Sequence, residues 1–221
     1  MRVEVESNPL FDILSADTSK SNVSLFFAKL FESLAASGIE VLDYEIDHLC
    51  WRCSTEQEYI SVGKAVSSIG ADLLVEGMIG GRPIATFKLN KPVALLIDGR
   101  RKEINCLEIP APKPNRPYIS GFEHVECVVG DLSSTPYDPT PVLAFRDKFS
   151  NHNWNTEALT KECNADISLS FDQNREEYPQ NIVVKFHAVS LDKVIEYEKR
   201  EGGVVSVPEG YPSISRVLGI E

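Results

Sequence analysis

A proline-rich stretch, Pro110–Pro117, divides the chain into two halves and constrains its fold more than any other feature. Because proline lacks a backbone N–H and fixes its φ angle, such a stretch acts as a stiff linker that continues neither a helix nor a central strand. A similar pattern starts on each side of it. Asp47–Cys50 and Glu123–Glu126 each open a strand with an acid followed by a histidine. We therefore expect two related modules joined by this linker.

Turn signals and hydrophobic periodicity place the elements of the two halves. Apolar residues recur at helical spacing over Asn22–Ala36, and the pairs Gly80-Gly81 and Asp98-Gly99 are strong hairpin signals. The expected strands are 47–53, 72–79, 83–89, 93–97 and 103–109 before the linker, and 123–129, 166–171 and 181–188 after it. Further helices are expected at 54–69, 140–149 and 191–201.

The order of these elements indicates a duplicated unit of one strand, one helix and further strands, whose two copies share one cavity. A chain of 221 residues is long enough to bury a core for such a pair. We expect an N-terminal helical extension over 1–46, a first module with the linker over 47–117, a second module with a C-terminal helix over 118–201, and an extended tail over 202–221.

Charge and cysteine content exclude several classes of protein. The formal net charge of −11 repels the phosphates of nucleic acids and anionic lipid, and no apolar run approaches the ~20 residues that span a bilayer. We therefore expect neither nucleic acid nor a membrane as a partner. Five cysteines and no recognisable signal peptide indicate reduced thiols and a cytoplasmic location. Cys50 and Cys53 match C-x-x-C, but residues i and i+3 of a strand face opposite sides, so no dithiol is expected.

Three of the four histidines fall at corresponding points of the two modules. His48 and His124 open them and are 76 residues apart, whereas Glu108 and His187 close them and are 79 residues apart. Alternate residues of a strand share a face, so these side chains turn away from the apolar residues beside them and line the shared cavity. His152 has no counterpart in the other module, and we leave it out of the site.

This set of three imidazoles and one carboxylate suits a divalent ion such as Zn, Ni, Fe(II), Mn or Co. An ion with an open coordination position would polarise an oxygen of a bound substrate. The alternative is that each histidine is an ordinary core or surface residue, which is the more frequent role of a lone histidine in a strand. The coincidence of positions in the two modules favours the metal site.

Three basic residues, Arg52, Lys88 and Lys185, face the same predicted cavity. They would suit a small anionic ligand, such as a carboxylate or an enolate. The alternative is that each of them pairs with a nearby acid. The sequence leaves both roles open.

Several motifs together resemble the YecM-like family of the vicinal oxygen chelate superfamily, which also contains glyoxalase I, extradiol dioxygenases and methylmalonyl-CoA epimerase. The motifs are DHLCWRC (47–53), EGMIGGRPIATFKL (76–89), LEIPAP (107–112), GFEHVE (121–126) and VKFH (184–187). The resemblance spans about Asp47–Glu198. It implies an α+β fold in which paired βαβββ modules form a curled mixed sheet around a central cavity, here with an N-terminal helical extension.

The resemblance also implies metal ligands on the first and last strands of each module, at His48, Glu108, His124 and His187. Glyoxalase-type relatives usually carry a carboxylate at the last of these positions, and that carboxylate often doubles as the proton-transferring base. Because this chain has His187 there, Glu108 and Glu126 are the candidate catalytic bases.

The activity that the resemblance implies is that of a divalent-metal-dependent enzyme acting on a small oxygen-rich metabolite, of the isomerase, epimerase, lyase or dioxygenase class. One rival is a non-catalytic module that binds or sequesters a small ligand in the same cavity. A second rival is a metal-free relic whose polar cluster serves the structure alone. Because two modules in one chain can close a site by themselves, a monomer is feasible.

Overall fold

The computed structural model describes residues 2–14, 22–172, 178–179 and 181–220. Its strands are β1 (Val3–Val5), β2 (Glu45–Arg52), β3 (Asp72–Ile79), β4 (Arg82–Ile97), β5 (Arg100–Pro110), β6 (Gly121–Val128), β7 (Asp166–Phe171) and β8 (Ile182–His187). Its helices are α1 (Pro9–Leu14), α2 (Val23–Ala36), α3 (Glu56–Ser68), α4 (Thr140–Lys148), the 3-10 turn η1 (Glu157–Thr160), α5 (Leu191–Glu201) and α6 (Ile214–Leu218).

Within these residues, one mixed eight-stranded sheet runs in the order β1-β4-β5-β2-β6-β8-β7, and β3 pairs with β4 as well. The central strand β2 is parallel to β5 and antiparallel to β6, and β6 is in turn parallel to β8. The first module comprises β2, α3, β3, β4 and β5, whereas the second comprises β6, α4, β7 and β8, with an isolated bridge between Asn155 and Ser168 beside β7. The predicted α+β fold with paired modules in a curled mixed sheet is confirmed.

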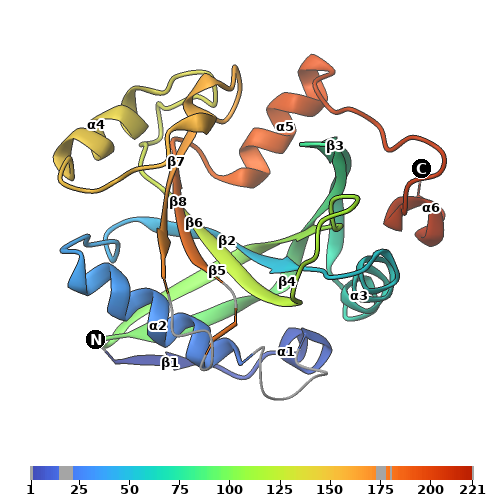
Figure 1. Ribbon diagram of the computed structural model, residues 1–221, viewed down its shortest axis with the longest axis horizontal. Helices are drawn as coiled ribbons and strands as arrows, with labels where there is room; N and C mark the ends of the chain where they lie inside the picture. Colours follow the sequence, from blue (N-terminus) through green and yellow to red (C-terminus); the bar gives the residue numbers. More distant parts are fainter. Residues whose placement is uncertain (1, 15–21, 173–177, 180, 221) are drawn as a thin grey trace.

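The sheet has an apolar face and a polar face. In Figure 1, β3 and β7 rise at the two ends of the curled sheet with α5 between them, whereas α1, α2 and β1 lie on the other side. The apolar face carries Leu49, Val125 and Phe186, each at most 1% exposed. Phe26 of α2 packs against Phe122, with ring centroids 5.8 Å apart, and Phe145 of α4 stacks on Phe186 at 4.3 Å. The burial of aromatic rings on this face leaves the opposite face for polar groups.

Three segments differ from the sequence-based expectation. The N-terminal extension contains a strand, β1, besides its helices. The two strands expected at 83–89 and 93–97 form one long strand, β4, with a register shift between Lys88 and Val93. Pro92 lies within that shift, where the missing N–H of proline is tolerated. The C-terminal tail is extended at first and then ends in the short helix α6, whose N-cap is Ser213.

None of the helices in the described part of the chain combines the length and the apolar character that a membrane crossing requires.

Candidate metal centre

The register of three neighbouring strands brings the polar side chains together. On β2, His48 lies opposite Glu126 of β6, and Cys50 lies between His124 of β6 and Glu108 of β5. The strands around β2 therefore present two adjacent rows of polar groups on one face of the sheet. This arrangement follows from the two-residue period of a strand, because residues two apart, such as His48 and Cys50, point to the same face of the sheet.

Two irregularities in the β2–β6 pairing bring in acids that strict alternation would turn to the apolar face. The register shifts between Ile46 and His48, and again between Cys50 and Trp51, so that Asp47 and Glu123 have no partner in the ladder. An extra residue of this kind is a β-bulge, which redirects its side chain. Asp47 Oδ1 consequently lies 3.3 Å from His48 Nδ1, and Glu123 Oε1 lies 3.5 Å from His124 Nδ1.

The other ring nitrogens of these two histidines converge on one carboxylate oxygen. His48 Nε2 lies 3.2 Å and His124 Nε2 lies 3.4 Å from Oε1 of Glu126. Glu108 Oε1 is 3.8 Å from His124 Nε2. His48, His124 and Glu126 are 1%, 2% and 4% exposed, so their donor atoms are shielded from water.

All four ring nitrogens of His48 and His124 are buried without a hydrogen-bond partner among the described residues. The neighbouring carboxylate oxygens are close, but the geometry does not align an N–H with them. Buried polar atoms are normally satisfied, and those that are not need an explanation such as a bound ion. Two imidazoles and a carboxylate within 4.8 Å of one another form a donor set that fits a divalent transition metal.

His187, a predicted ligand, lies on the far side of His48 from His124. Its ring centroid is 5.9 Å from that of His48, and it forms a group with Asp47 and His48 rather than with His124. Both of its ring nitrogens have partners: Nε2 lies 3.1 Å from Asp47 Oδ1, and Nδ1 lies 3.1 Å from Asn164 Oδ1. The four predicted ligands thus fall into neighbouring groups. The group whose ring nitrogens lack partners among the described residues consists of His48, His124 and Glu126, so Glu126 and not His187 is its third member.

Asp47 joins this centre to helix α5. Its Oδ2 accepts a hydrogen bond of 2.6 Å from the backbone N–H of Leu191, the first residue of that helix. Asp192 of the same turn forms an ion pair with Lys88, at 2.6 Å. The start of α5 therefore closes the end of the polar face at which His187 lies.

The acids give the centre a strong attraction for positive charge. Burial alone would raise the pKa of Glu126, but Lys185 and His48 outweigh it and hold the pKa well below its usual value. Burial alone would lower the pKa of His48, but Glu126 and Asp47 raise it well above its usual value. Because a metal ion needs unprotonated imidazole, protons and metal compete for the same ring nitrogens.

The three predicted ligand-binding cations all pair with acids. Lys185 Nζ lies 2.5 Å from Glu126 Oε1, the same oxygen to which His48 and His124 turn. Arg52 Nε donates to Glu123 at 2.6 Å, and Lys88 pairs with Asp192. The pairing that the sequence left open is therefore present, and Arg52 and Lys185 also adjoin the metal-ligand candidates.

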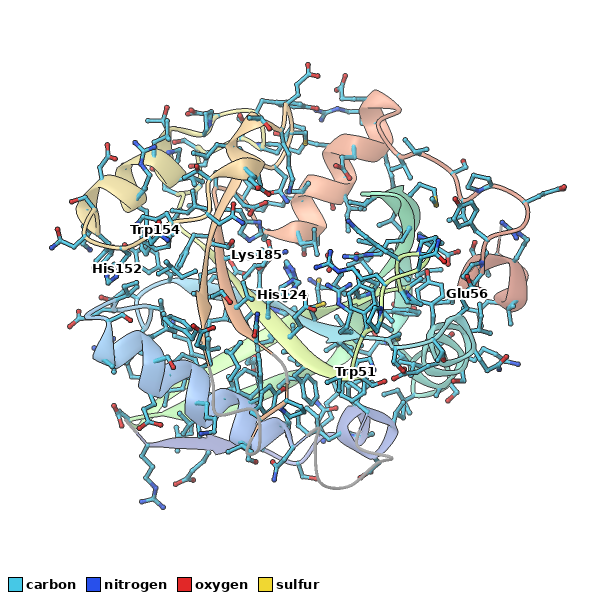
Figure 2. All side chains as sticks on the ribbon, viewed as in Figure 1. Trp51, Glu56, His124, His152, Trp154 and Lys185 are labelled. Atoms are coloured by element: carbon cyan, nitrogen blue, oxygen red, sulfur yellow. The ribbon has the colours of Figure 1, made fainter. Side chains whose placement is uncertain are left out.

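Cys50 belongs to the site, whereas His152 lies outside it. Cys50 is fully buried and forms a group with Glu108 and His124, whereas His152 contacts Trp154 with ring centroids 5.9 Å apart. Figure 2 shows His124 in the middle of the molecule and His152 with Trp154 near α4 at its edge. All five cysteines are free, so Cys50 and Cys53 form no disulfide.

Sequence reasoning missed the contribution of Asp47 and Glu123. Strict alternation assigns both to the apolar face, and only the bulges turn them toward His48 and His124. The signal was present in the acid–histidine pairs at 47–48 and 123–124, since a ligating histidine commonly has a carboxylate at its other nitrogen.

Two known structures are similar to this chain, and the first of them supports the fold. A structural-genomics protein, EC4020, aligns with a TM-score of 0.60 at 21% identity, over 88% of this chain and 98% of that one. A methylmalonyl-CoA epimerase, solved with methylmalonyl-CoA and NH4+, aligns with a TM-score of 0.40 at 12% identity, over 68% of this chain and 97% of the epimerase. The second similarity is too low to bear on the substrate.

Sequence relatives define the family. The chain is 25% identical over 197 residues to an uncharacterised protein of Haemophilus influenzae, covering 85% of this chain and 95% of that protein. It is 30% identical over 124 residues to Protein YecM of Escherichia coli, covering 56% of this chain and 60% of the relative. The family model described as YecM protein matches residues 16–198, and this match extends across β2, β5, β6 and β8, which carry the polar centre. The chain therefore belongs to the YecM family, as its motifs predicted.

Proposed function

We propose that this protein is a divalent-metal-dependent enzyme acting on a small oxygen-rich metabolite, with His48, His124 and Glu126 as the principal metal ligands. The observation that carries the proposal is that the four buried ring nitrogens of His48 and His124 have no hydrogen-bond partner among the described residues. Two imidazoles and one carboxylate also match the facial donor set that leaves coordination positions open for a substrate. Zn, Ni, Fe(II), Mn and Co are the candidate ions.

When bound, the ion would act as a Lewis acid toward two adjacent oxygens of the substrate. Asp47 and Glu123 lie 3.3 and 3.5 Å from Nδ1 of His48 and of His124, so they are placed to accept the Nδ1–H groups once Nε2 of each ring binds the ion. His187 in turn holds Asp47 in place. The burial of these groups excludes water and strengthens their electrostatic interactions.

Glu108 is the carboxylate that we propose as the base. Its side chain is 15% exposed, compared with 5% for Glu126, so it is the more accessible of the two to a substrate. Burial would raise the pKa of Glu108, but Lys185 and His124 outweigh it and lower the pKa, which keeps the group ionised and able to accept a proton. Glu126 contacts His48, His124 and Lys185 and is held in place. Isomerase, epimerase and lyase chemistry all need one such proton transfer.

Metal content tests the proposal. Protein made without a His-tag is reconstituted separately with Zn, Ni, Mn and Fe(II), dialysed and measured by elemental analysis. We expect about one ion per chain for the wild type and for His152→Ala, because His152 is remote from the centre, and a loss of most of that metal in His124→Ala. Wild-type protein that retains none of these ions would contradict the proposal, as would full occupancy in His124→Ala.

A non-catalytic binding module is the second candidate function. It is favoured by the ion pair of Lys185 with Glu126, because the ammonium group already neutralises the carboxylate at which a catalytic metal ion would bind. Proton exchange in D2O, measured by NMR on 1,2-dicarbonyl compounds and 2-oxo acids, separates the two functions. An enzyme should give metal-dependent exchange that Glu108→Gln reduces about 100-fold or more, within the usual contribution of a general base. A binding module should give ligand-induced shifts and no exchange.

A further inference from the structure

A second polar feature, here called the arginine pocket, opens at the end of the centre opposite to α5. It has a volume of about 340 Å³ and is lined by residues that include Arg52, Arg116, Tyr118, Glu123 and Val183. This volume lies at the lower end of the range for small-molecule sites, about 300–1,000 Å³.

The pocket adjoins the metal-ligand candidates directly. Val183 of β8 pairs with His124 in the sheet register, and Glu123 lies 3.5 Å from His124 Nδ1. Arg52 follows Cys50 on the same face of β2, one row beyond the row of Glu108 and His124. A small molecule in the pocket could therefore extend toward His124.

Arg52 has a buried donor without a partner among the described residues. The residue is only 6% exposed, and its Nε and Nη2 both donate to Glu123. Its Nη1 is buried and has no hydrogen-bond partner in the described part of the chain. The Tyr118 ring supports the guanidinium, whose Cζ lies 5.2 Å from the ring centroid. Because Glu123 fixes two of its nitrogens, Arg52 presents the third in a defined direction.

A second arginine, Arg82, does not line the pocket but has a similar donor without a partner among the described residues. Its Nε is buried and lacks a partner among the described residues. The pairing of β4 with β5 puts Arg82 on the same strand face as Thr86, which lies opposite Glu108. Burial and the nearby Arg52 both lower the pKa of Arg82, as expected for two neighbouring guanidinium groups. Desolvated like charges need an anion between them.

Arg116 lines the pocket and adds a positive charge beside that of Arg52. Its Cζ lies 5.8 Å from the centroid of the Tyr118 ring, so Tyr118 contacts both Arg116 and Arg52. Glu123 forms an ion pair with Arg52, and no ion pair of Arg82 or Arg116 is present among the described residues. In a chain with a net charge of −11, this local excess of positive charge marks a place that attracts anions.

We propose that the arginine pocket binds the carboxylate of a small metabolite through Arg52 Nη1, that the positive charge of the neighbouring Arg82 strengthens this binding, and that Arg116 attracts the group to the pocket. Arg52 Nη1 would donate a charge-assisted hydrogen bond to one oxygen of that carboxylate. A phosphate dianion has more oxygens to satisfy and would be repelled more strongly by Glu123 and Glu108. The proposal deepens the proposed function, because it makes the substrate a carboxylic acid whose other oxygens reach the metal centre.

Binding to metal-free protein tests the pocket independently of the metal. Full-length protein is treated with a chelator, and titration calorimetry or ligand-observed NMR measures binding of malonate, pyruvate and inorganic phosphate. We expect malonate or pyruvate to bind, and Arg82→Gln to weaken that binding about tenfold or more, the factor that corresponds to about 1.4 kcal/mol. Arg100→Gln is the matched control, because Arg100 is 60% exposed at a hairpin and pairs with Asp43.

A second variant and the metal assay distinguish a failure of the pocket proposal from a failure of the proposed metal function. Arg116→Gln leaves the buried Arg52–Glu123 pair intact, and we expect it to weaken carboxylate binding less than Arg82→Gln does. Carboxylate binding that depends on Arg82 in a chain that retains no metal would support the pocket and overturn only the metal function. Binding that is unchanged in Arg82→Gln, or phosphate binding tighter than that of either carboxylate, would overturn the pocket proposal even if the metal binds.

Discussion

Glu126 is the residue on which the positive charges of the centre converge. One of its oxygens lies 3.2 Å from His48, 3.4 Å from His124 and 2.5 Å from Lys185. A metal ion held by the two imidazoles and Glu126 would share that oxygen with the ammonium group of Lys185. Unit charges about 4 Å apart interact by about 1 to 4 kcal/mol between bulk water and the environment near a protein surface. If the proposed metal centre is correct, Lys185 would therefore weaken the binding of the ion.

Replacing Lys185 by methionine should strengthen metal binding. The change removes a competing positive charge and leaves Glu126 in need of another cation, so we expect the Kd for Zn to fall about tenfold, or about 1.4 kcal/mol. Competition with a coloured chelator measures the change. Lys88→Met is the control, since Lys88 pairs with Asp192 instead. Equal or weaker Zn binding in Lys185→Met would show that Glu126 is not a ligand.

The sequence pointed to residues of the centre that lie in regular parts of the strands. It missed those whose side chains are redirected by a β-bulge. Repeat position and strand alternation placed His48, His124 and Glu108 on one face, and the structure has them on two adjacent rows of that face. Their role as metal ligands stays a prediction. Asp47 was missed because its position depends on a bulge, which has no dependable signature in a single sequence. The contacts of His187 depend on Asn164, which lies in a loop whose path the sequence does not define.

Two bulges and the start of α5 connect the elements around the centre. Asp47 accepts from the Leu191 N–H and contacts His48 and His187, so one carboxylate links β2, β8 and α5. The pKa of Asp47 is lowered, because His187 and His48 outweigh the effect of burial. This carboxylate therefore holds the helix against the sheet through one oxygen and contacts His187 and His48 through the other.

Asp47→Asn should loosen this junction. The new amide would carry only one acceptor oxygen, so Leu191 or His187 would lose its partner in a buried place. We expect a loss of about 1–3 kcal/mol in the free energy of unfolding, measured by urea denaturation. Asp43→Asn should change it by less than about 0.5 kcal/mol, because the Asp43 side chain is 83% exposed. Equal stabilities of the two variants would contradict this role.

A second element, α6, depends on Glu76 of β3. The carboxylate accepts from the backbone N–H groups of Ile214 and Ser215, and from the hydroxyls of Tyr59 and Ser213. Burial would raise the pKa of Glu76, but these hydrogen bonds outweigh it and lower the pKa below its usual value of 4.5. The stabilisation is therefore fully present above about pH 4.5 and is lost as the pH falls through the lowered pKa.

Hydrogen exchange at α6 measures this dependence. We expect the amides of 214–218 to lose protection below pH 4.5 relative to the rest of the chain, after correction for intrinsic rates. Glu76→Gln should weaken their protection already at pH 7, and Glu56→Gln, at an exposed position of α3, should not. Protection of α6 that is the same in Glu76→Gln and the wild type would contradict the account.

Most elements could be predicted from periodicity and turn residues, and the exceptions have physical reasons. The bounds of β3, β7 and α5 agree with the expectation, because each element stops at a glycine or where the period of its hydrophobic pattern changes. The joining of two expected strands into β4 was missed, since Pro92 normally ends a strand and only pairing with β5 shows that it lies in a register shift. The boundaries of the domains themselves stay a prediction.

At the scale of the whole molecule, the centre lies where the two modules meet. His48 comes from β2 of the first module and His124 with Glu126 from β6 of the second, and β2 pairs with β6. An ion held by all three would bind to the folded chain and not to the unfolded chain. It would therefore stabilise the junction between the two modules.

Metal should consequently raise the thermal stability of the whole chain. Free metal at 100 times its Kd contributes about 2.7 kcal/mol. For a chain of 221 residues this corresponds to an increase in Tm of about 5–10 °C. Differential scanning calorimetry with and without Zn measures the shift, which His124→Ala should largely remove and His152→Ala should retain. A shift of the same size in His124→Ala would place the ion elsewhere.

The most direct test of the metal centre is an anomalous difference map from crystals of the tag-free protein loaded with Zn or Co. The account predicts one strong peak bonded to His48 Nε2, His124 Nε2 and a carboxylate oxygen of Glu126, with nitrogen and oxygen distances of about 2.0–2.2 Å. The absence of a peak there, or a peak bonded instead to Cys50 Sγ or to Asp47 and His187, would contradict it.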